Sequence, residues 1–136
     1  MRIAVIDGQG GGIGKLIVEK LREQLGQQVE ILALGTNVLA TSAMLKAGAD
    51  EGATGENAIV HNAPRVDFIV GSMGIISANT MLGELTPAMA RAVSDSPARK
   101  VLVPLNRCNF YVVGVKNQPL PQYIDELVDI VKNCMI

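Results

Sequence analysis

The sequence predicts a three-layer α/β domain built on a doubly wound, mostly parallel sheet. Short apolar, β-branched segments alternate along the chain with amphipathic segments of helical period, a pattern typical of strands joined by crossover helices. The connections are short, and right-handed crossovers favour the strand order 3-2-1-4-5. The 136 residues fit one domain spanning 1–136, which is long enough to bury a core without disulfide or metal support.

The first third of the chain predicts a βαβ unit followed by a helix. Residues 2–7 form a short apolar run that ends at a glycine, as in a strand buried on both faces. Residues 13–25 carry apolar side chains at helical spacing, and Gly26 follows them as a stop signal. A second strand is expected over 29–34, and Thr36 or Asn37 is placed to cap a helix from about 38 to 46.

The rest of the chain continues the alternation. We expect a strand near 52–54, a helix near 56–62, a strand over 66–70, one helical turn within 75–85, a helix opened by Thr86-Pro87, and a strand over 101–105. Only residues 106–109 precede the apolar run 110–115, which is too short for a helical crossover. A sixth, antiparallel strand is therefore predicted at the sheet edge, and a final amphipathic helix after Pro119 and Pro121.

The composition limits the binding partners and the cellular compartment that we expect for this protein. The formal net charge is −1 with 12 basic and 13 acidic residues well mixed, which predicts neither nucleic acid nor an anionic membrane surface as a partner. No apolar run reaches the roughly 18 residues of a membrane span, and residues 1–8 do not fit a signal peptide. We expect a cytoplasmic protein with two reduced thiols, Cys108 and Cys134, and no metal site.

A glycine-rich loop lies between the first strand and the first helix. Five glycines occupy the seven positions 8–14, at the place where backbone N–H groups of a helix N-terminus converge on an anion. The predicted ligand-binding residues of this loop are Gly8, Gln9, Gly10, Gly11, Gly12, Ile13 and Gly14. A small phosphate-bearing ligand is the expected partner, and a tight turn that only packs the helix is the alternative.

Other candidate ligand-binding residues follow the carboxyl ends of other strands, where ligands of doubly wound sheets bind. They are Thr36, Asn37, Ser72, Asn106 and Arg107. The second strand is not followed by the carboxylate that usually anchors the ribose of NAD. NAD(P), a mononucleotide, a coenzyme A fragment and a sugar phosphate therefore remain open as cofactors, and Thr36 and Asn37 have a plain helix cap as their alternative role.

Two residues are candidates for chemistry. Cys108 would act as a nucleophile if its pKa were lowered, with Arg107 beside it to hold a carboxylate or phosphate. Asp7 would bond the loop N–H groups, bind a ribose hydroxyl or bridge to the ligand through a cation. The alternative for Arg107 and Cys108 is a solvated turn without a role in binding or chemistry.

Two known phosphate loops resemble parts of this one. Gly8, Gly12 and Gly14 match G-x-x-x-G-x-G, which resembles the cofactor loop of short-chain dehydrogenases, but Tyr111 and Lys116 do not have that family's catalytic spacing. Residues 10–15 resemble the deviant phosphate loop of partitioning-type ATPases. Gly10 replaces the leading lysine of that loop and Leu16 replaces its magnesium-binding residue, so ATP hydrolysis by this route is not expected.

The whole chain also resembles a short bacterial Rossmann-like family of unknown function, through the segments Asp-Gly-Gln-Gly-Gly-Gly-Ile-Gly (7–14) and Asn-Arg-Cys-Asn (106–109). That resemblance implies the fold and no established activity. Together with the residues it favours a Rossmann-like protein that binds a nucleotide or an NAD(P)-like dinucleotide. A small enzyme using Arg107 and Cys108 and a ligand-free interaction subunit are the alternatives, and apolar residues near the C-terminus predict a homo-oligomer, most simply a dimer.

Overall fold

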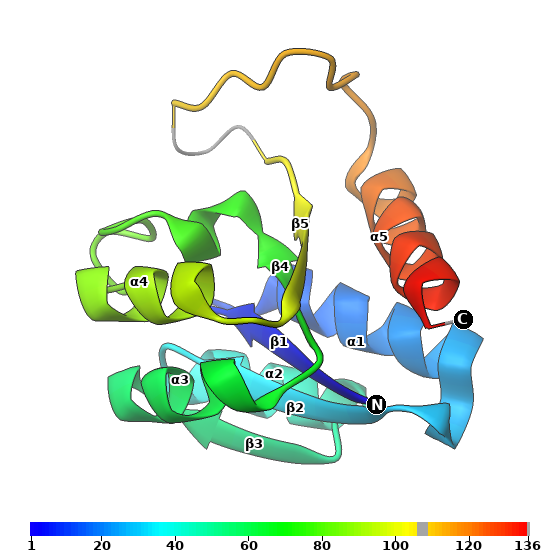
Figure 1. Cartoon of the computed structure of the whole chain (residues 1–136), viewed down its shortest axis with the longest axis horizontal. Coiled ribbons are helices and arrows are strands. Elements are labelled where there is room, and N and C mark those ends of the chain that lie inside the picture. The colour runs from blue at the N-terminus through cyan, green and yellow to red at the C-terminus, as the bar shows by residue number, and fades with distance from the viewer. Residues whose placement is uncertain (106–108, 136) are drawn as a thin grey trace.

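The computed structural model describes residues 1–105 and 109–135, which form the predicted three-layer α/β fold (Figure 1). The middle layer is a five-stranded parallel sheet in the order β3-β2-β1-β4-β5. Its strands are β1 (Arg2–Asp7), β2 (Glu30–Gly35), β3 (Glu51–Thr54), β4 (Phe68–Ser72) and β5 (Arg99–Val103). The helices are α1 (Gly12–Leu25), α2 (Val38–Ala47), α3 (Glu56–Asn62), α4 (Pro87–Asp95) and α5 (Leu120–Cys134).

The sheet separates two hydrophobic cores. In β1, Ile3 and Val5 pack toward α1, α2 and α5, whereas Ala4 and Ile6 pack toward α3 and α4. This alternation explains why the strand reads as a continuous apolar run, because both of its faces are buried. Figure 1 shows the two helical layers on opposite sides of the sheet.

The central strand β1 marks the point where the chain changes direction across the sheet. The chain passes from β1 to β2 and β3 on one side, then crosses to β4 and β5 on the other. The loops that follow β1 and β4 diverge at such a point and leave a crevice at the carboxyl ends of the strands. The glycine loop and Ser72 lie at these two ends.

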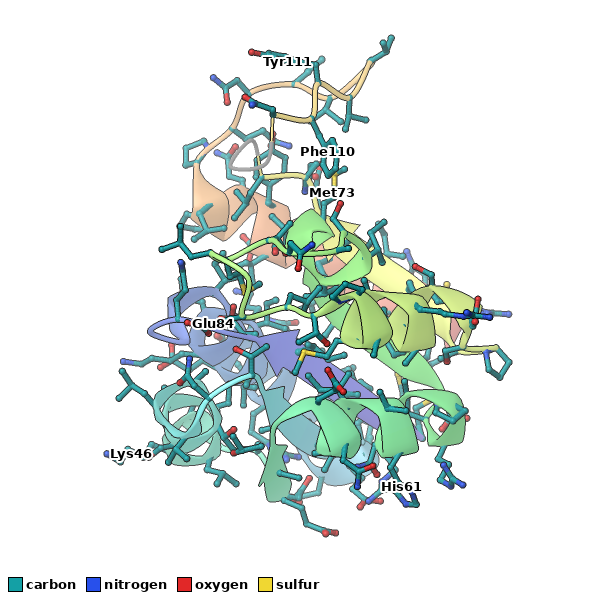
Figure 2. The ribbon with its side chains drawn as sticks, turned by 90° about the vertical axis from the view of Figure 1, so that its left-hand side faces the viewer. Lys46, His61, Met73, Glu84, Phe110 and Tyr111 are labelled. Atoms are coloured by element: carbon teal, nitrogen blue, oxygen red, sulfur yellow. The ribbon has the colours of Figure 1, made fainter. Side chains whose placement is uncertain are left out.

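The predicted sixth strand is wrong. Residues 110–115 have no strand structure, and the described part of the sheet ends at β5. A turn interrupts the segment, in which Val115 N–H donates to Val112 O at 3.3 Å and Gly114 has a φ of 86°, outside the range of extended chain. Apolar, β-branched composition alone did not produce pairing, and the segment extends away from the sheet (Figures 1 and 2).

The final helix agrees with its predicted amphipathic pattern. One face of α5, formed by Tyr123, Ile124, Leu127, Val128 and Val131, is buried against the core that also contains α1. Pro119 and Pro121 precede or begin the helix, where proline is compatible with helical geometry. Among the helices of the described residues, none is long and apolar enough to cross a bilayer.

Candidate functional site

Asp7 holds the two ends of the glycine loop together. Its side chain, at the end of β1, is buried, with Oδ1 accepting the Gly8 N–H at 2.8 Å and Oδ2 accepting the Gly14 N–H at 2.7 Å. Of the three roles considered for Asp7, bonding to loop N–H groups is the one that the structure shows. The carboxylate therefore fixes how the loop enters α1.

Three backbone N–H groups of the loop region are open to a ligand. The loop closes a turn through Gly11 N–H to Gly8 O at 2.9 Å, and Lys15 N–H donates to Gly11 O at 2.9 Å. Within residues 1–105 and 109–135, the N–H groups of Gly10, Gly12 and Ile13 meet no acceptor. Two of these groups belong to the first turn of α1, where the helix dipole favours an anion.

Three of the five loop glycines are explained by packing and backbone geometry. Gly11 has a φ of 74°, and a Cβ there would lie 2.8 Å from the Cα of Ala40. A Cβ on Gly14 would lie 2.6 Å from the Sδ of Met44. At Gly8 it would lie 2.5 Å from the Oγ1 of Thr36 and 2.6 Å from the Sδ of Met81. Larger residues at these positions would displace helix α2, the Thr36 side chain or the residues that cover Gly8.

The other two glycines have no such explanation in the described residues. Gly10 and Gly12 lack a left-handed φ, and a Cβ on either would have no heavy atom within 4 Å. Gly12 is the first residue of α1, and glycine within a helix costs about 0.5–1 kcal/mol relative to alanine. Both residues border a pocket, so open space above their Cα atoms is the property they share.

The pocket has a volume of about 630 Å³ and opens at the carboxyl ends of β1 and β4. One side is formed by the glycine loop, Ser72 and Gly74. The Ser72 hydroxyl accepts the Gly74 N–H at 3.2 Å, which orders the turn after β4. The apolar side chains that also line the pocket are those of Ile13 in the loop itself and of Leu16, Met81, Leu82, Leu105 and Leu120. The pocket thus combines a polar floor of backbone groups with an apolar wall.

The remaining predicted site residues are placed differently. Thr36 and Asn37 do not line this pocket, and Asn37 caps α2 by accepting the Ala40 N–H at 2.8 Å. The predictions for Asn106, Arg107 and Cys108 fall outside the described residues. The structure therefore brings the glycine loop and Ser72 together in one pocket and directs Thr36 and Asn37 to another partner.

That partner is Glu84, which sequence reasoning missed. One carboxylate oxygen of Glu84, whose position Figure 2 shows, accepts three hydrogen bonds. The donors are the Thr36 hydroxyl at 2.7 Å, the Asn37 amide at 2.8 Å and the Gln9 N–H at 2.8 Å. Hydrogen bonds from Thr36, Gln9 and Asn37 hold the pKa of Glu84 below its usual value, against the opposing effect of burial. The sequence carries no local signal for these contacts, because Glu84 lies in an irregular segment far along the chain.

Comparisons with known proteins give a family but no activity. A family model described as a domain of unknown function (DUF3842) matches residues 2–136. No curated protein matches the sequence. Among solved structures, the crystal structure of a dodecameric FMN-dependent UbiX-like decarboxylase from Escherichia coli O157:H7 is similar at 12% identity, with a TM-score of 0.47 and coverage of 99% of this chain and 94% of that one.

Proposed function

The chain belongs to the DUF3842 family, a domain of unknown function, and we propose that it binds a small phosphate-bearing ligand of the mononucleotide class. The observation that carries this proposal is the pair Gly10 and Gly12. Both border the pocket without any packing or backbone requirement for glycine in the described residues. A ligand that approaches the backbone closely supplies that requirement.

The phosphate is assigned to the open N–H groups of Gly10, Gly12 and Ile13. Backbone amides at a helix N-terminus bind phosphate through hydrogen bonds and through the helix dipole. Asp7 is nearby and negatively charged, but two loop N–H groups already donate to its carboxylate. Those bonds offset part of the repulsion between Asp7 and a bound phosphate.

The rest of the ligand is assigned to the apolar wall. Leu16, Leu105 and Leu120 face the pocket from α1, from the chain after β5 and from the start of α5. A pocket of about 630 Å³ falls within the range of about 300–1,000 Å³ typical of small-molecule sites. An uncharged, flat group attached to a phosphate, such as a nucleobase with its ribose, suits this combination of floor and wall.

A mononucleotide is favoured over NAD(P) by the β2 side of the loop. The polar groups at the end of β2, Thr36 and Asn37, are already bonded to Glu84. Their donor groups are therefore already used and do not serve the second ribose of a dinucleotide. A ligand-free interaction subunit is disfavoured because, apart from the chain neighbours of each glycine, no side chain of the described residues lies within 4 Å of the open positions above Gly10 and Gly12. An enzyme that uses Arg107 and Cys108 stays a prediction.

We also propose that a second copy of the chain covers the exposed segment 109–115. Tyr111 and Val113 there are 85% and 99% exposed, and Phe110 is also exposed. Figure 2 shows Phe110 and Tyr111 on the part of the chain that extends from the sheet. Contiguous apolar side chains of this kind mark association surfaces on soluble domains. A symmetric pair of such segments would bury them in a homodimer.

The function is tested by thermal unfolding with inorganic phosphate, AMP, FMN, nicotinamide mononucleotide, and the matching nucleosides without phosphate. At least one phosphomonoester should stabilise the fold, by about 2.7 kcal/mol at 100 times its dissociation constant. Its nucleoside should do so much less. Gly12→Val should abolish the effect, because the added side chain fills the open space above Gly12, while Val18→Ile on the buried face of α1 serves as a substitution remote from the loop. No shift with any phosphomonoester would refute the proposal.

A further inference from the structure

The two sides of the glycine loop differ in how much space the protein leaves. Above Gly10 and Gly12 the space is open, whereas above Gly8 it is filled by Thr36, Met81 and Glu84, each with an atom within 3.0 Å of an added Cβ. Thr36 follows β2, while Met81 and Glu84 belong to residues 77–86, which we call the crossing segment. The crossing segment thus covers the loop at Gly8 and leaves the space above Gly10 and Gly12 open.

The crossing segment is tied down at both of its sides. Near β4, the Thr80 hydroxyl donates to Gly74 O at 2.6 Å, and Leu85 is fully buried. Toward β2, Glu84 accepts the three hydrogen bonds from Gln9, Thr36 and Asn37. Among the described residues, Glu84 is the group of the crossing segment that is hydrogen-bonded to the end of β2.

The backbone of the segment is held in unfavourable conformations. Met81 and Leu82 have φ values of 59° and 57°, in the left-handed region that non-glycine residues rarely adopt. Leu82 is also 98% exposed. Such conformations persist only where surrounding contacts impose them, and the Glu84 hydrogen bonds are contacts of this kind.

The donors that Glu84 occupies are those that the second half of a dinucleotide would need. In doubly wound sheets the pyrophosphate takes N–H groups of the first loop, and the ribose beyond it is held by a residue at the end of the second strand. Glu84 uses the Gln9 N–H and both polar residues after β2.

We infer that Glu84 is a specificity-determining residue, which limits the site to mononucleotides by holding the crossing segment over the β2 half of the groove. The inference rests on the proposed function, because it names which phosphate-bearing ligands that same pocket accepts. Glu84 acts here by occupying donors and space.

The test compares NAD⁺ with its two halves, AMP and nicotinamide mononucleotide, by calorimetric titration of the wild type, Glu84→Gln, Glu84→Ala and the control Glu19→Gln on the exposed side of α1. The wild type and the control should bind one mononucleotide at least about tenfold more tightly than NAD⁺. In Glu84→Ala this preference should fall by about tenfold or more, with NAD⁺ gaining affinity. The preference of Glu84→Gln for a mononucleotide over NAD⁺ should be intermediate between those of the wild type and Glu84→Ala. An unchanged preference in both variants would overturn the inference.

A second measurement separates this inference from the proposed function. Amide hydrogen exchange of Gln9 and limited proteolysis across residues 77–86 report on the crossing segment without any ligand. Both should be slow in the wild type and in Glu19→Gln and faster in Glu84→Ala. If exchange accelerates but neither half of NAD⁺ nor any other phosphomonoester of the thermal-unfolding set binds any form of the protein, the proposed function fails and the selectivity assigned to Glu84 fails with it. If a mononucleotide binds but exchange and preference do not change, only the role of Glu84 is refuted.

Discussion

The Oδ2 atom of Asp7 accepts the backbone N–H of Gly14 at 2.7 Å, while Oδ1 of the same side chain accepts the N–H of Gly8 at 2.8 Å. One buried carboxylate therefore joins the end of β1 to the first turn of α1. An asparagine has one acceptor atom, so its amide group would face one of the two N–H donors.

Asp7→Asn is expected to destabilise the fold by about 1.5–3 kcal/mol, since a charged hydrogen bond is lost and a buried donor is left unpaired. The free energy of unfolding in urea measures this effect. Asp67→Asn is the matched control, because Asp67 accepts a single backbone N–H from Arg2 at an exposed position. An equal decrease in the free energy of unfolding in the two variants would contradict the role of Asp7 in joining β1 to α1.

Gly12→Ala and Gly14→Ala should differ in stability although they lie two residues apart. A Cβ on Gly12 meets open space, whereas one on Gly14 would lie 2.6 Å from Met44 Sδ and 2.9 Å from Asp7 Cβ. Gly14→Ala should cost about 1–3 kcal/mol through overpacking. Gly12→Ala should leave the unfolding free energy unchanged or slightly higher, because alanine is the better helix former. A destabilised Gly12→Ala would show that the fold itself requires that glycine.

Arg22 should not be replaceable by lysine. Its guanidinium donates to Gly26 O at 2.7 Å, to Gly48 O at 2.9 Å and to Asp50 Oδ2 at 2.7 Å. The planar fork thus links the end of α1, the end of α2 and the start of β3, and a lysine ammonium does not reproduce its directions. Arg22→Lys is expected to lose about 1–3 kcal/mol in urea unfolding. Arg91→Lys, at an exposed i,i+4 pair with Asp95, should change little.

Asp50 should contribute to the acid sensitivity of the fold. A hydrogen bond from the Ile31 N–H and another from Arg22 hold the pKa of Asp50 below its usual value. A lowered folded-state pKa adds stability that is present above the unfolded-state value, about 3.9, and is lost as the pH falls through the folded-state value. Urea unfolding should therefore show Asp50→Asn to be less stable than the wild type at pH 6, with the difference shrinking below about pH 4. A difference that is constant with pH would contradict this.

The proposed dimer predicts an effect of charge on the exposed segment. Light scattering at high protein concentration should give a dimer mass for the wild type and a monomer mass for Val113→Asp. Val38→Asp is the control, because Val38 is also an exposed valine, at 72%, on helix α2. A monomeric wild type, or equal dissociation of both variants, would refute the role of the 109–115 segment.

Sequence patterns predicted the elements that are buried on both faces or along one clear stripe. The continuous apolar run of β1 and the amphipathic face of α5 were recognised because burial alone determines them. The boundaries were less accurate at the edge of the sheet. β5 starts at Arg99 rather than near Val101, since an edge strand is exposed enough to tolerate charged residues that a central strand excludes.

The parts that the sequence did not predict depend on contacts between distant segments. Glu84 reaches Thr36 and Gln9 only because the irregular chain before α4 passes over the end of β1, and no periodicity encodes that path. The helical turn expected within 75–85 lies instead at Met73–Ile76, directly after β4. The predicted phosphate loop had a local signal, because its five glycines fall within the seven positions 8–14.

The position of β1 in the sheet has a consequence for synthesis. β1 pairs with β2 on one side, and its other edge pairs with β4. The partner of Ile3 on that edge is Phe68, which is synthesised much later. During translation the β1–α1–β2 unit emerges before β4 and presents an unpaired, apolar strand edge until residues 68–70 have left the ribosome. Unpaired strand edges recruit other chains, so a pause in translation before β4, or truncation after α3, would favour co-translational aggregation.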